Sequence, residues 1–173
     1  LAQNPDIEHI EFLDLLFNGN MKLLIEFCDL MISEPIKEGL KWHANAIIRP
    51  EMTKEVLEKM KKAGCFHLSF GIESGSQDVL NLMKKRYKTE DADNVLRYAH
   101  ESGIQTTCNF MFGFPGETEN DFKKTLGFLE RNRDYINFAY PSRSFCTIEP
   151  NSYLEKNLEE FGVIPSSIHG QYW

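Results

Sequence analysis

The sequence has 173 residues, of which 42% are hydrophobic and 26% charged, a composition typical of one globular domain with a sizeable core. Its formal net charge of −7 argues against a general nucleic-acid surface, because phosphate binding needs clustered Lys and Arg. No apolar run approaches the roughly 20 residues that span a bilayer, and no signal peptide is visible. We therefore expect a cytoplasmic protein with neither membrane nor nucleic acid as a partner.

In chain order, apolar periodicity and turn residues predict alternating strands and helices. The predicted elements are strand 7–14, helix 19–33, strand 42–49, helix 53–63, strand 66–73, helix 76–83, helix 89–102, strand 105–113, helix 118–129, strand 135–145 and helix 152–161. This βα alternation predicts a parallel sheet with right-handed crossovers. Five βα units are too few for a closed eight-stranded barrel, so they fit either part of an open barrel or a doubly wound sheet.

The four cysteines are Cys28, Cys65, Cys108 and Cys146, and no two of them form a Cys-x-x-Cys pair. We interpret them as reduced core residues and predict no metal site within the chain. The chain begins at Leu1 rather than Met, in a segment that resembles the approach to a strand. We interpret it as an excised domain or a trimmed chain.

The predicted strands end in polar residues, and in both architectures chemistry belongs at these carboxyl ends. The candidates are Asp14, Arg49, Glu73-Ser74, Asn109 and Ser142-Arg143. Asn45 and His43 belong with Arg49, because alternate residues of a strand lie on the same face. A single acid there can simply cap the next helix, but the whole set suits a polar ligand such as a nucleoside or an amino acid. The other histidines show no catalytic partner at useful spacing, and the basic run 83–88 is interpreted as a solvated loop face.

The segment from Gly113 through Pro115 to Gly116 predicts a tight turn between a strand and a helix that Thr118 caps. Two glycines let the backbone approach a bulky group closely. A ligand could lie against this turn, although an ordinary βα loop would have the same pattern.

Several motifs, in this order, resemble those of radical S-adenosylmethionine (radical SAM) enzymes. They are Gly71-Ile-Glu-Ser-Gly-Ser76, Ser102-Gly-Ile104, the segment 109–118, and Pro150-Asn-Ser-Tyr-Leu154, where Asn151 replaces the family's Gly. Segment 12–20 resembles the cobalamin-dependent group, which includes anaerobic magnesium-protoporphyrin monomethyl ester cyclases.

The resemblance implies an α/β fold, a partial (β/α)6 TIM-like barrel whose second to sixth strands are the five predicted here, with the first strand missing. Residues 1–161 would form the radical SAM core, and residues 162–173 a C-terminal tail or linker. Implied contacts with S-adenosylmethionine are Asp14, Glu73, Ser74, Phe112, Gly113, Pro115, Gly116, Tyr140 and Ser142. Asn109, Asn45 and Arg49 would face the barrel interior, nearer the cofactor or the substrate.

The family's Cys-x-x-x-Cys-x-x-Cys run, which holds a [4Fe–4S] cluster, is absent from this chain. We therefore expect a fragment that is inactive alone, with cluster ligands outside it, and an open strand edge that promotes self-association. Cobalamin is implied by the subgroup resemblance alone.

The expected function is a radical oxidoreductase or methyltransferase that takes hydrogen from an organic small molecule, with a porphyrin as one candidate. The alternatives are a non-catalytic barrel module that binds a nucleoside or a partner, and a phosphate-binding βα-barrel enzyme that uses the helix start at Thr118. The acidic charge disfavours tRNA as a substrate.

Overall fold

The computed structural model describes residues 6–142 and 148–164. Within them, one sheet of five parallel strands has the order β1-β2-β3-β4-β5. The strands are β1 (His9–Phe12), β2 (Lys41–Ala46), β3 (Cys65–Glu73), β4 (Gln105–Phe110) and β5 (Phe138–Pro141). Each strand therefore pairs with its neighbour in the sequence, without the reversal of strand order that marks a doubly wound sheet.

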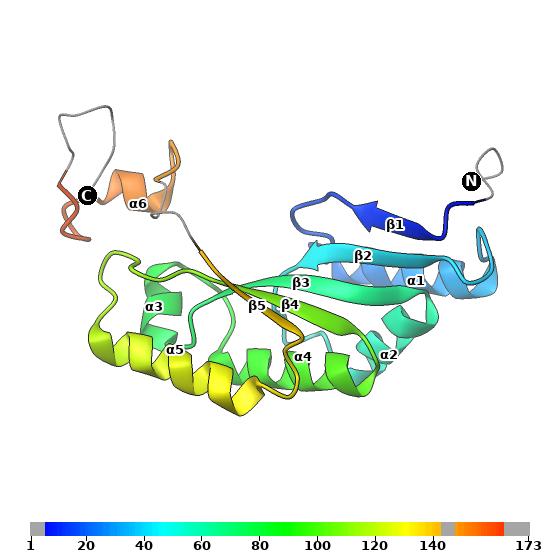
Figure 1. The fold of residues 1–173 in the computed structure, drawn as a ribbon. Coiled ribbons are helices and arrows are strands. Elements are labelled where there is room, and N and C mark those ends of the chain that lie inside the picture. Colours follow the sequence, from blue (N-terminus) through cyan, green and yellow to red (C-terminus); the bar gives the residue numbers. More distant parts are fainter. Residues whose placement is uncertain (1–5, 143–147, 165–173) are drawn as a thin grey trace.

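Helices connect these strands along one face of the sheet, and one further short helix follows the last strand. They are α1 (Met21–Ser33), α2 (Lys54–Lys62), α3 (Gln77–Leu82), α4 (Thr89–Glu101), α5 (Glu119–Asn132) and the short α6 (Tyr153–Lys156). Figure 1 shows α2, α4 and α5 below the sheet, with the opposite face open and α6 beyond the carboxyl ends of the strands. Sequential strand order with helices on one face is the arrangement of a β/α barrel, so the predicted partial barrel is confirmed.

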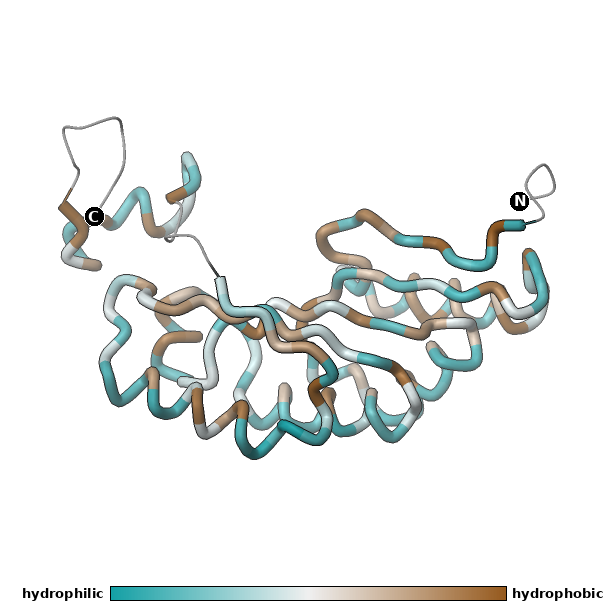
Figure 2. The backbone as a smooth tube through the Cα atoms, in the orientation of Figure 1, coloured by the Kyte–Doolittle hydropathy of each residue, from teal (hydrophilic) through white to brown (hydrophobic). Residues whose placement is uncertain are grey.

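Alternating burial divides the side chains of each strand between the two faces. In β2, Trp42, Ala44 and Ala46 are buried against the helices, whereas His43 and Asn45 face the open side. The indole Nε1 of Trp42 donates to the Ala63 carbonyl oxygen at 2.8 Å, which satisfies its only polar atom. Figure 2 shows the complementary pattern, with hydrophilic residues along the outer turns of α4 and α5.

A second apolar cluster lies apart from this core, and its buried members are Val79, Phe114, Leu154 and Val163. It holds the segment that contains α6 against α3 and the loop after β4. Asn151 in this segment has φ 64°, the left-handed backbone that Asn tolerates best after Gly. The substitution of Asn for the family's glycine is therefore accommodated.

The predicted ends of several strands and of the last helix differ from the structure. Strand 7–14 is only His9–Phe12 and strand 42–49 ends at Ala46, so Asp14 and Arg49 lie in the loops that follow these strands. Strand 105–113 ends at Phe110, because the chain turns and Gly113 takes φ 72°. Strand 135–145 is only Phe138–Pro141 in the described residues, and its predicted end at 143–145 lies outside them. Helix 152–161 ends at Lys156, where Asn157 leaves helical geometry and its side-chain amide donates to the Tyr153 carbonyl oxygen.

Within residues 6–142 and 148–164, no helix is both long and apolar enough to cross a membrane. The predicted division into residues 1–161 and 162–173 stays a prediction.

Candidate functional site

Glu73, the last residue of β3, has an unusual backbone. Its φ is 66°, and only Lys84 and Asn151 share a positive φ among the non-glycine residues described. The register between β3 and β4 shifts at this point, and the Glu73 carbonyl oxygen accepts from the Met111 N–H at 2.8 Å. A non-glycine residue in this conformation costs energy, of the order of 1–3 kcal/mol, and such residues concentrate at functional sites.

The left-handed backbone turns the Glu73 carboxylate back over Gly71. A Cβ built on Gly71 would lie 2.6 Å from Glu73 Oε1, so only glycine leaves the space that the carboxylate occupies. The same oxygen accepts from Lys85 Nζ at 3.1 Å, and this ammonium also donates to the Gly71 carbonyl oxygen at 3.3 Å. Both side chains are about three-quarters buried, with exposures of 22% for Glu73 and 27% for Lys85. The second carboxylate oxygen of Glu73 has no partner among the described residues, so it can accept a hydrogen bond from a ligand.

Ser74 follows Glu73 but serves the packing between α3 and α5. Its buried hydroxyl bonds Thr125 Oγ1 at 3.0 Å and accepts from the Ser76 N–H at 3.1 Å. Next to it, Ser76 Oγ donates to Asp121 Oδ1 at 2.6 Å. The Ser76 hydroxyl is the main cause that lowers the pKa of Asp121, and the Thr118 hydroxyl and Lys124 add to it. The structure therefore places the Ser74 side chain in a buried network, and a contact of this residue with the cofactor stays a prediction.

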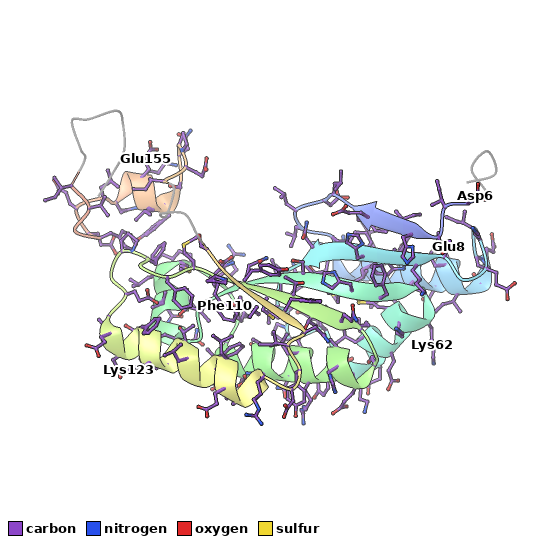
Figure 3. The ribbon with its side chains drawn as sticks, in the orientation of Figure 1. Asp6, Glu8, Lys62, Phe110, Lys123 and Glu155 are labelled. Carbon is purple, nitrogen blue, oxygen red and sulfur yellow. The ribbon has the colours of Figure 1, made fainter. Side chains whose placement is uncertain are left out.

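Hydrogen bonds hold the turn after β4 both at its start and at its end. Gly113 has φ 72° and its N–H donates to Glu117 Oε2, while Gly116 has φ 91°. Thr118 caps α5 through a capping box in which its side chain and that of Asp121 accept each other's backbone N–H groups. The turn is thus an ordered βα loop with exposed backbone. Phe110, just before it, lies between the sheet and α5 (Figure 3).

A cavity of about 260 Å³ adjoins this turn, between the end of α3 and the α6 segment. Its walls are mainly apolar, and they comprise Leu82, Met83, Lys84, Met111, Phe114, Glu149, Ser152, Tyr153, Leu154 and Phe161. Met111 links the cavity to Glu73 through the backbone bond described above. A flat, mostly apolar group of a ligand could lie here beside the turn.

The remaining candidate residues fall into two groups. Asn45, Asn109 and Tyr140 lie on the open face, and Asn109 is aligned with Tyr140 on β5. Asp14 and Arg49 lie instead beside the loop between β1 and α1. Asp14 is exposed, and an Arg49 terminal nitrogen donates to the Gly19 carbonyl oxygen at 2.9 Å. Arg49 Nε is buried and has no partner among the described residues.

Ser142 continues the ladder at the end of β5, since its N–H donates to the Phe110 carbonyl oxygen at 2.7 Å. Pro115 and Phe112 belong to the turn itself, and Phe112 packs edge-on against Phe122 of α5 at 5.5 Å between ring centroids. Arg143, a candidate strand-end residue, lies outside the described residues.

Two residues of the basic run 83–88 are not solvated, so that interpretation of the run was wrong for them. Lys85 pairs with Glu73, as described, and Tyr87 is buried with its hydroxyl donating to the Ile72 carbonyl oxygen at 2.6 Å. Burial raises the pKa of Tyr87, with smaller contributions from Glu73 and Cys108. The aromatic ring of Tyr87 was the one local signal that this run is not wholly solvated.

The described cysteines do not form a metal site. Cys28, Cys65 and Cys108 are buried, and burial raises the pKa of both Cys28 and Cys108 to about 12. No group of three potential ligands suitable for a metal ion occurs in the described part of the chain. Cys146 lies outside that part.

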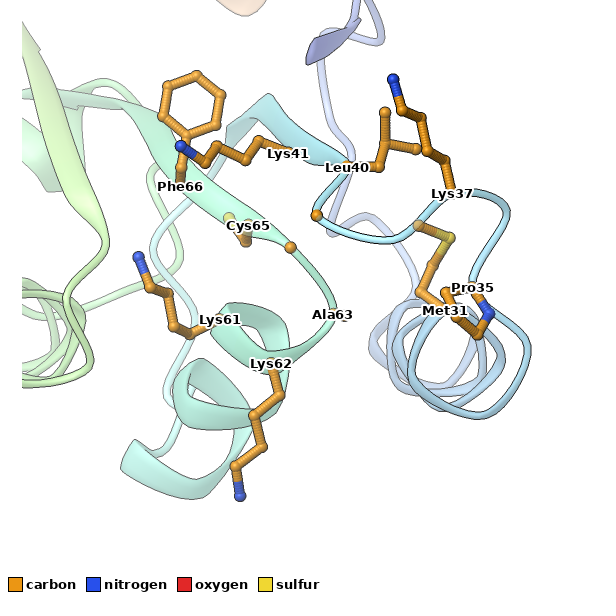
Figure 4. A pocket seen from close by; sticks show the side chains of 12 residues that line it. Met31, Pro35, Lys37, Leu40, Lys41, Lys61, Lys62, Ala63, Cys65 and Phe66 are labelled. Carbon is orange, nitrogen blue, oxygen red and sulfur yellow. The ribbon is translucent and has the colours of Figure 1, made fainter. Parts of the chain in front are cut away.

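A second cavity, of about 270 Å³, lies at the opposite ends of β2 and β3 (Figure 4). Lys37, Lys41, Lys61 and Lys62 surround it, and Figure 4 shows their ammonium groups pointing in different directions. Helices α1 and α2 end here, and lysines stabilise the carbonyl groups at helix C-termini. We therefore assign no function to this cavity.

Comparison with known proteins identifies relatives for most of the chain. The family model described as the Radical SAM superfamily matches residues 8–129. An uncharacterized methyltransferase from Pyrococcus horikoshii is 33% identical over 91% of this chain and 35% of its own length. The anaerobic magnesium-protoporphyrin IX monomethyl ester cyclase of Cereibacter sphaeroides is 31% identical over 61% of this chain and 18% of its own length. A tRNA-2-methylthio-N(6)-dimethylallyladenosine synthase from Buchnera aphidicola is 36% identical over 72% of this chain and 29% of its own length.

A solved structure also shares the fold. The radical S-adenosylmethionine methyltransferase TsrM from Kitasatospora setae, with cobalamin and a [4Fe–4S] cluster bound, superposes with a TM-score of 0.67. It is 22% identical, and the match covers 82% of this chain and 26% of that one. The chain thus spans about a third or less of the length of these relatives.

Proposed function

The chain belongs to the radical SAM superfamily, and we propose that it supplies the S-adenosylmethionine-binding part of a radical SAM enzyme that acts on a small organic molecule. The observation that carries this proposal is Glu73, held at φ 66° over Gly71 at the carboxyl edge of the sheet, beside the glycine turn. Such an edge is where β/α barrels bind their ligands.

The residues at this edge fit the chemical groups of S-adenosylmethionine. The free oxygen of Glu73 suits a ribose hydroxyl, and the backbone of the turn with the adjacent cavity suits a flat adenine ring. The positive charge of the Arg49 guanidinium suits a carboxylate. Bound next to a reduced [4Fe–4S] cluster, this cofactor supplies a 5′-deoxyadenosyl radical that abstracts hydrogen. The residues of this chain bind and orient the cofactor, and Lys85 holds the Glu73 carboxylate in place.

The described residues do not fit the cluster itself. Cluster iron needs thiolate ligands, whereas burial keeps the Cys28 and Cys108 thiols protonated. Residues outside the described part of the chain would have to hold it.

The reaction that we propose for the whole enzyme is either a methyl transfer or a radical oxidation. The methyltransferases and the cyclase among the relatives support these two outcomes. Cobalamin as a second cofactor is supported by the cobalamin-bound relative of the same fold. A small-molecule substrate is supported by the net charge of −7, which opposes binding of a polyanion.

Anaerobic reconstitution with iron and sulfide tests the proposal, on a full-length protein that carries this chain together with the cysteines that bind the cluster. We expect a brown protein that forms 5′-deoxyadenosine from S-adenosylmethionine when dithionite is added, and a Glu73→Gln variant that forms at least about tenfold less. Binding of S-adenosylmethionine without any cleavage would instead support the non-catalytic binding module. The absence of both binding and cleavage would overturn the proposal.

A further inference from the structure

The open face of the sheet carries polar side chains in rows that cross the strands. Register places Glu11, His43, His67 and Gln105 in one row, and Asn45, Ser69, Thr107 and Phe138 in the next. Both rows lie deeper along the strands than Glu73 and the glycine turn. Interiors of β/α barrels are usually filled with Val, Ile and Leu, so a polar interior needs a reason.

Two close polar pairs lie side by side in these rows, one of an imidazole with a carboxylate and one of an imidazole with a hydroxyl. His43 Nε2 lies 3.2 Å from Glu11 Oε1, and His67 Nε2 lies 2.8 Å from Thr107 Oγ1. The two imidazole rings are 5.8 Å apart between centroids, at 70° to each other. Burial, and secondarily His43, lower the pKa of His67, so this ring is neutral near pH 7.

Much of the hydrogen-bonding capacity of this face is unused. His43 Nδ1 is buried and has no partner among the described residues. In the described part of the chain, the side chains of Asn45 and Gln105 and the second nitrogen of His67 also have no bonding partner. Asn45 and Gln105 are exposed, so their amides can bond water or a ligand, and covering them without a partner would cost the desolvation of each one. The face is therefore suited to hold water or a polar ligand.

The charges on this face offset one another. Lys41 is aligned with His9 one row below Glu11, on the same side of the sheet. Neither a carboxylate nor an ammonium would meet a net opposite charge here. The aromatic rings of Phe138 and Tyr140, which are 48% and 54% exposed, border the rows on the β5 side.

We propose that this face is a specificity site for the substrate, and that it binds an uncharged group that both donates and accepts hydrogen bonds, such as an amide, attached to a flat ring. His67 is the central contact, and Thr107 is a positioning residue whose hydroxyl holds the His67 ring in place. Phe138 and Tyr140 contact the ring. To call this face a substrate site rests on the proposed function. The binding test itself needs neither the iron–sulfur cluster nor S-adenosylmethionine.

Three ring compounds of matched size serve as probes: benzamide, benzoate and benzylammonium. Their binding to the purified protein is followed by ligand-observed NMR and by the ring resonances of His67. We expect benzamide to bind at least about fivefold more tightly than either charged probe, which corresponds to one or two neutral hydrogen bonds.

The variants separate a specific site from a solvated surface. Thr107→Val and His67→Phe should each weaken benzamide binding by about fivefold, whereas His67→Gln should retain most of it because it keeps a donor and an acceptor. His100→Phe is the matched control, since His100 lies on α4 against Tyr135, at 5.6 Å between ring centroids. Equal binding of the three probes, or benzamide binding that is unchanged in both Thr107→Val and His67→Phe, would overturn the proposal. Failure of 5′-deoxyadenosine formation would overturn the proposed function and leave this result unaffected.

Discussion

Lys85 Nζ lies 3.1 Å from Glu73 Oε1, and the pair occupies the space above Gly71 that any other side chain would fill. The lysine comes from the loop after α3, the carboxylate from the end of β3, and the glycine from within the strand. The three positions therefore work together: glycine gives the space, the left-handed backbone directs the carboxylate into it, and the ammonium fixes one of its oxygens. The other oxygen is left for a ligand at the edge where the glycine turn lies.

Gly71→Ala tests this arrangement. The new methyl group would lie 2.6 Å from Glu73 Oε1, so the carboxylate must leave its present position. We expect the affinity for S-adenosylmethionine, measured by calorimetry on the reconstituted protein, to fall at least about tenfold. Gly127→Ala is the matched control, because nothing lies within 4 Å of its Cβ position on α5. It should leave affinity unchanged and stabilise the helix by about 0.5–1 kcal/mol. Unchanged affinity in Gly71→Ala would show that Glu73 does not bind the cofactor.

Asp121→Asn should destabilise the protein, most strongly above the acid range. Asp121 accepts hydrogen bonds from Ser76 and Thr118, and these lower its pKa below the ordinary value of 3.8. The unfolded state then binds more protons as the pH falls, so the stabilisation is present above that value and is lost below it. We expect a loss of about 2 kcal/mol at pH 7 from urea unfolding, which shrinks towards pH 2. Asp134→Asn, at a carboxylate that is 80% exposed, should change stability little at either pH.

The sequence predicted the order and type of the elements well, because apolar periodicity follows directly from which face each residue buries. The alternation in Trp42–Ala46 and the capping of α5 by Thr118 are local signals, and both were identified correctly. The end of β4 was placed too late, because the departure at Gly113 depends on the turn that follows it. The last helix was placed too long, because the apolar residues after Lys156 pack on α3 and Phe114 without helical geometry.

The site was harder to predict, because its partners come from distant positions in the chain. Glu73 and the glycine turn stand at strand ends and carry motifs, so the sequence identified them. Lys85 lay within a run of basic residues, and nothing local distinguished it from Lys84. His67 and Thr107 are 40 residues apart and meet only through the register of β3 and β4. The sequence therefore identified site residues that lie at strand ends, but not the side-chain pairs that form between distant segments.

The folded protein should become less stable at mildly acid pH because of His67. Its pKa is lowered by burial and by His43, so the unfolded chain takes up a proton on this residue before the folded protein does. Stability is therefore full above the ordinary histidine value of 6.5 and decreases as the pH falls through it towards the lower folded value. Urea unfolding between pH 7.5 and 5 measures the slope. His67→Gln should flatten the dependence, and an unchanged slope in that variant would show that other groups cause it.

Self-association of the 173-residue chain should depend on the edge formed by β1 and α1. In the described residues β1 pairs only with β2, so its outer edge is open, and Leu23 and Leu30 of α1 are each 60% exposed on one helix face. An open strand beside an apolar helix face is a surface that a second copy can cover. We expect oligomers in sedimentation velocity at micromolar concentration, and a Leu23→Glu, Leu30→Glu double variant that associates at least about tenfold more weakly. The control is Phe122→Glu with Leu126→Glu on α5, where both residues are exposed (40% and 46%) but far from the open edge of β1. Equal weakening by the two double variants would indicate non-specific apolar association, and a monodisperse monomer would show that the edge does not self-associate.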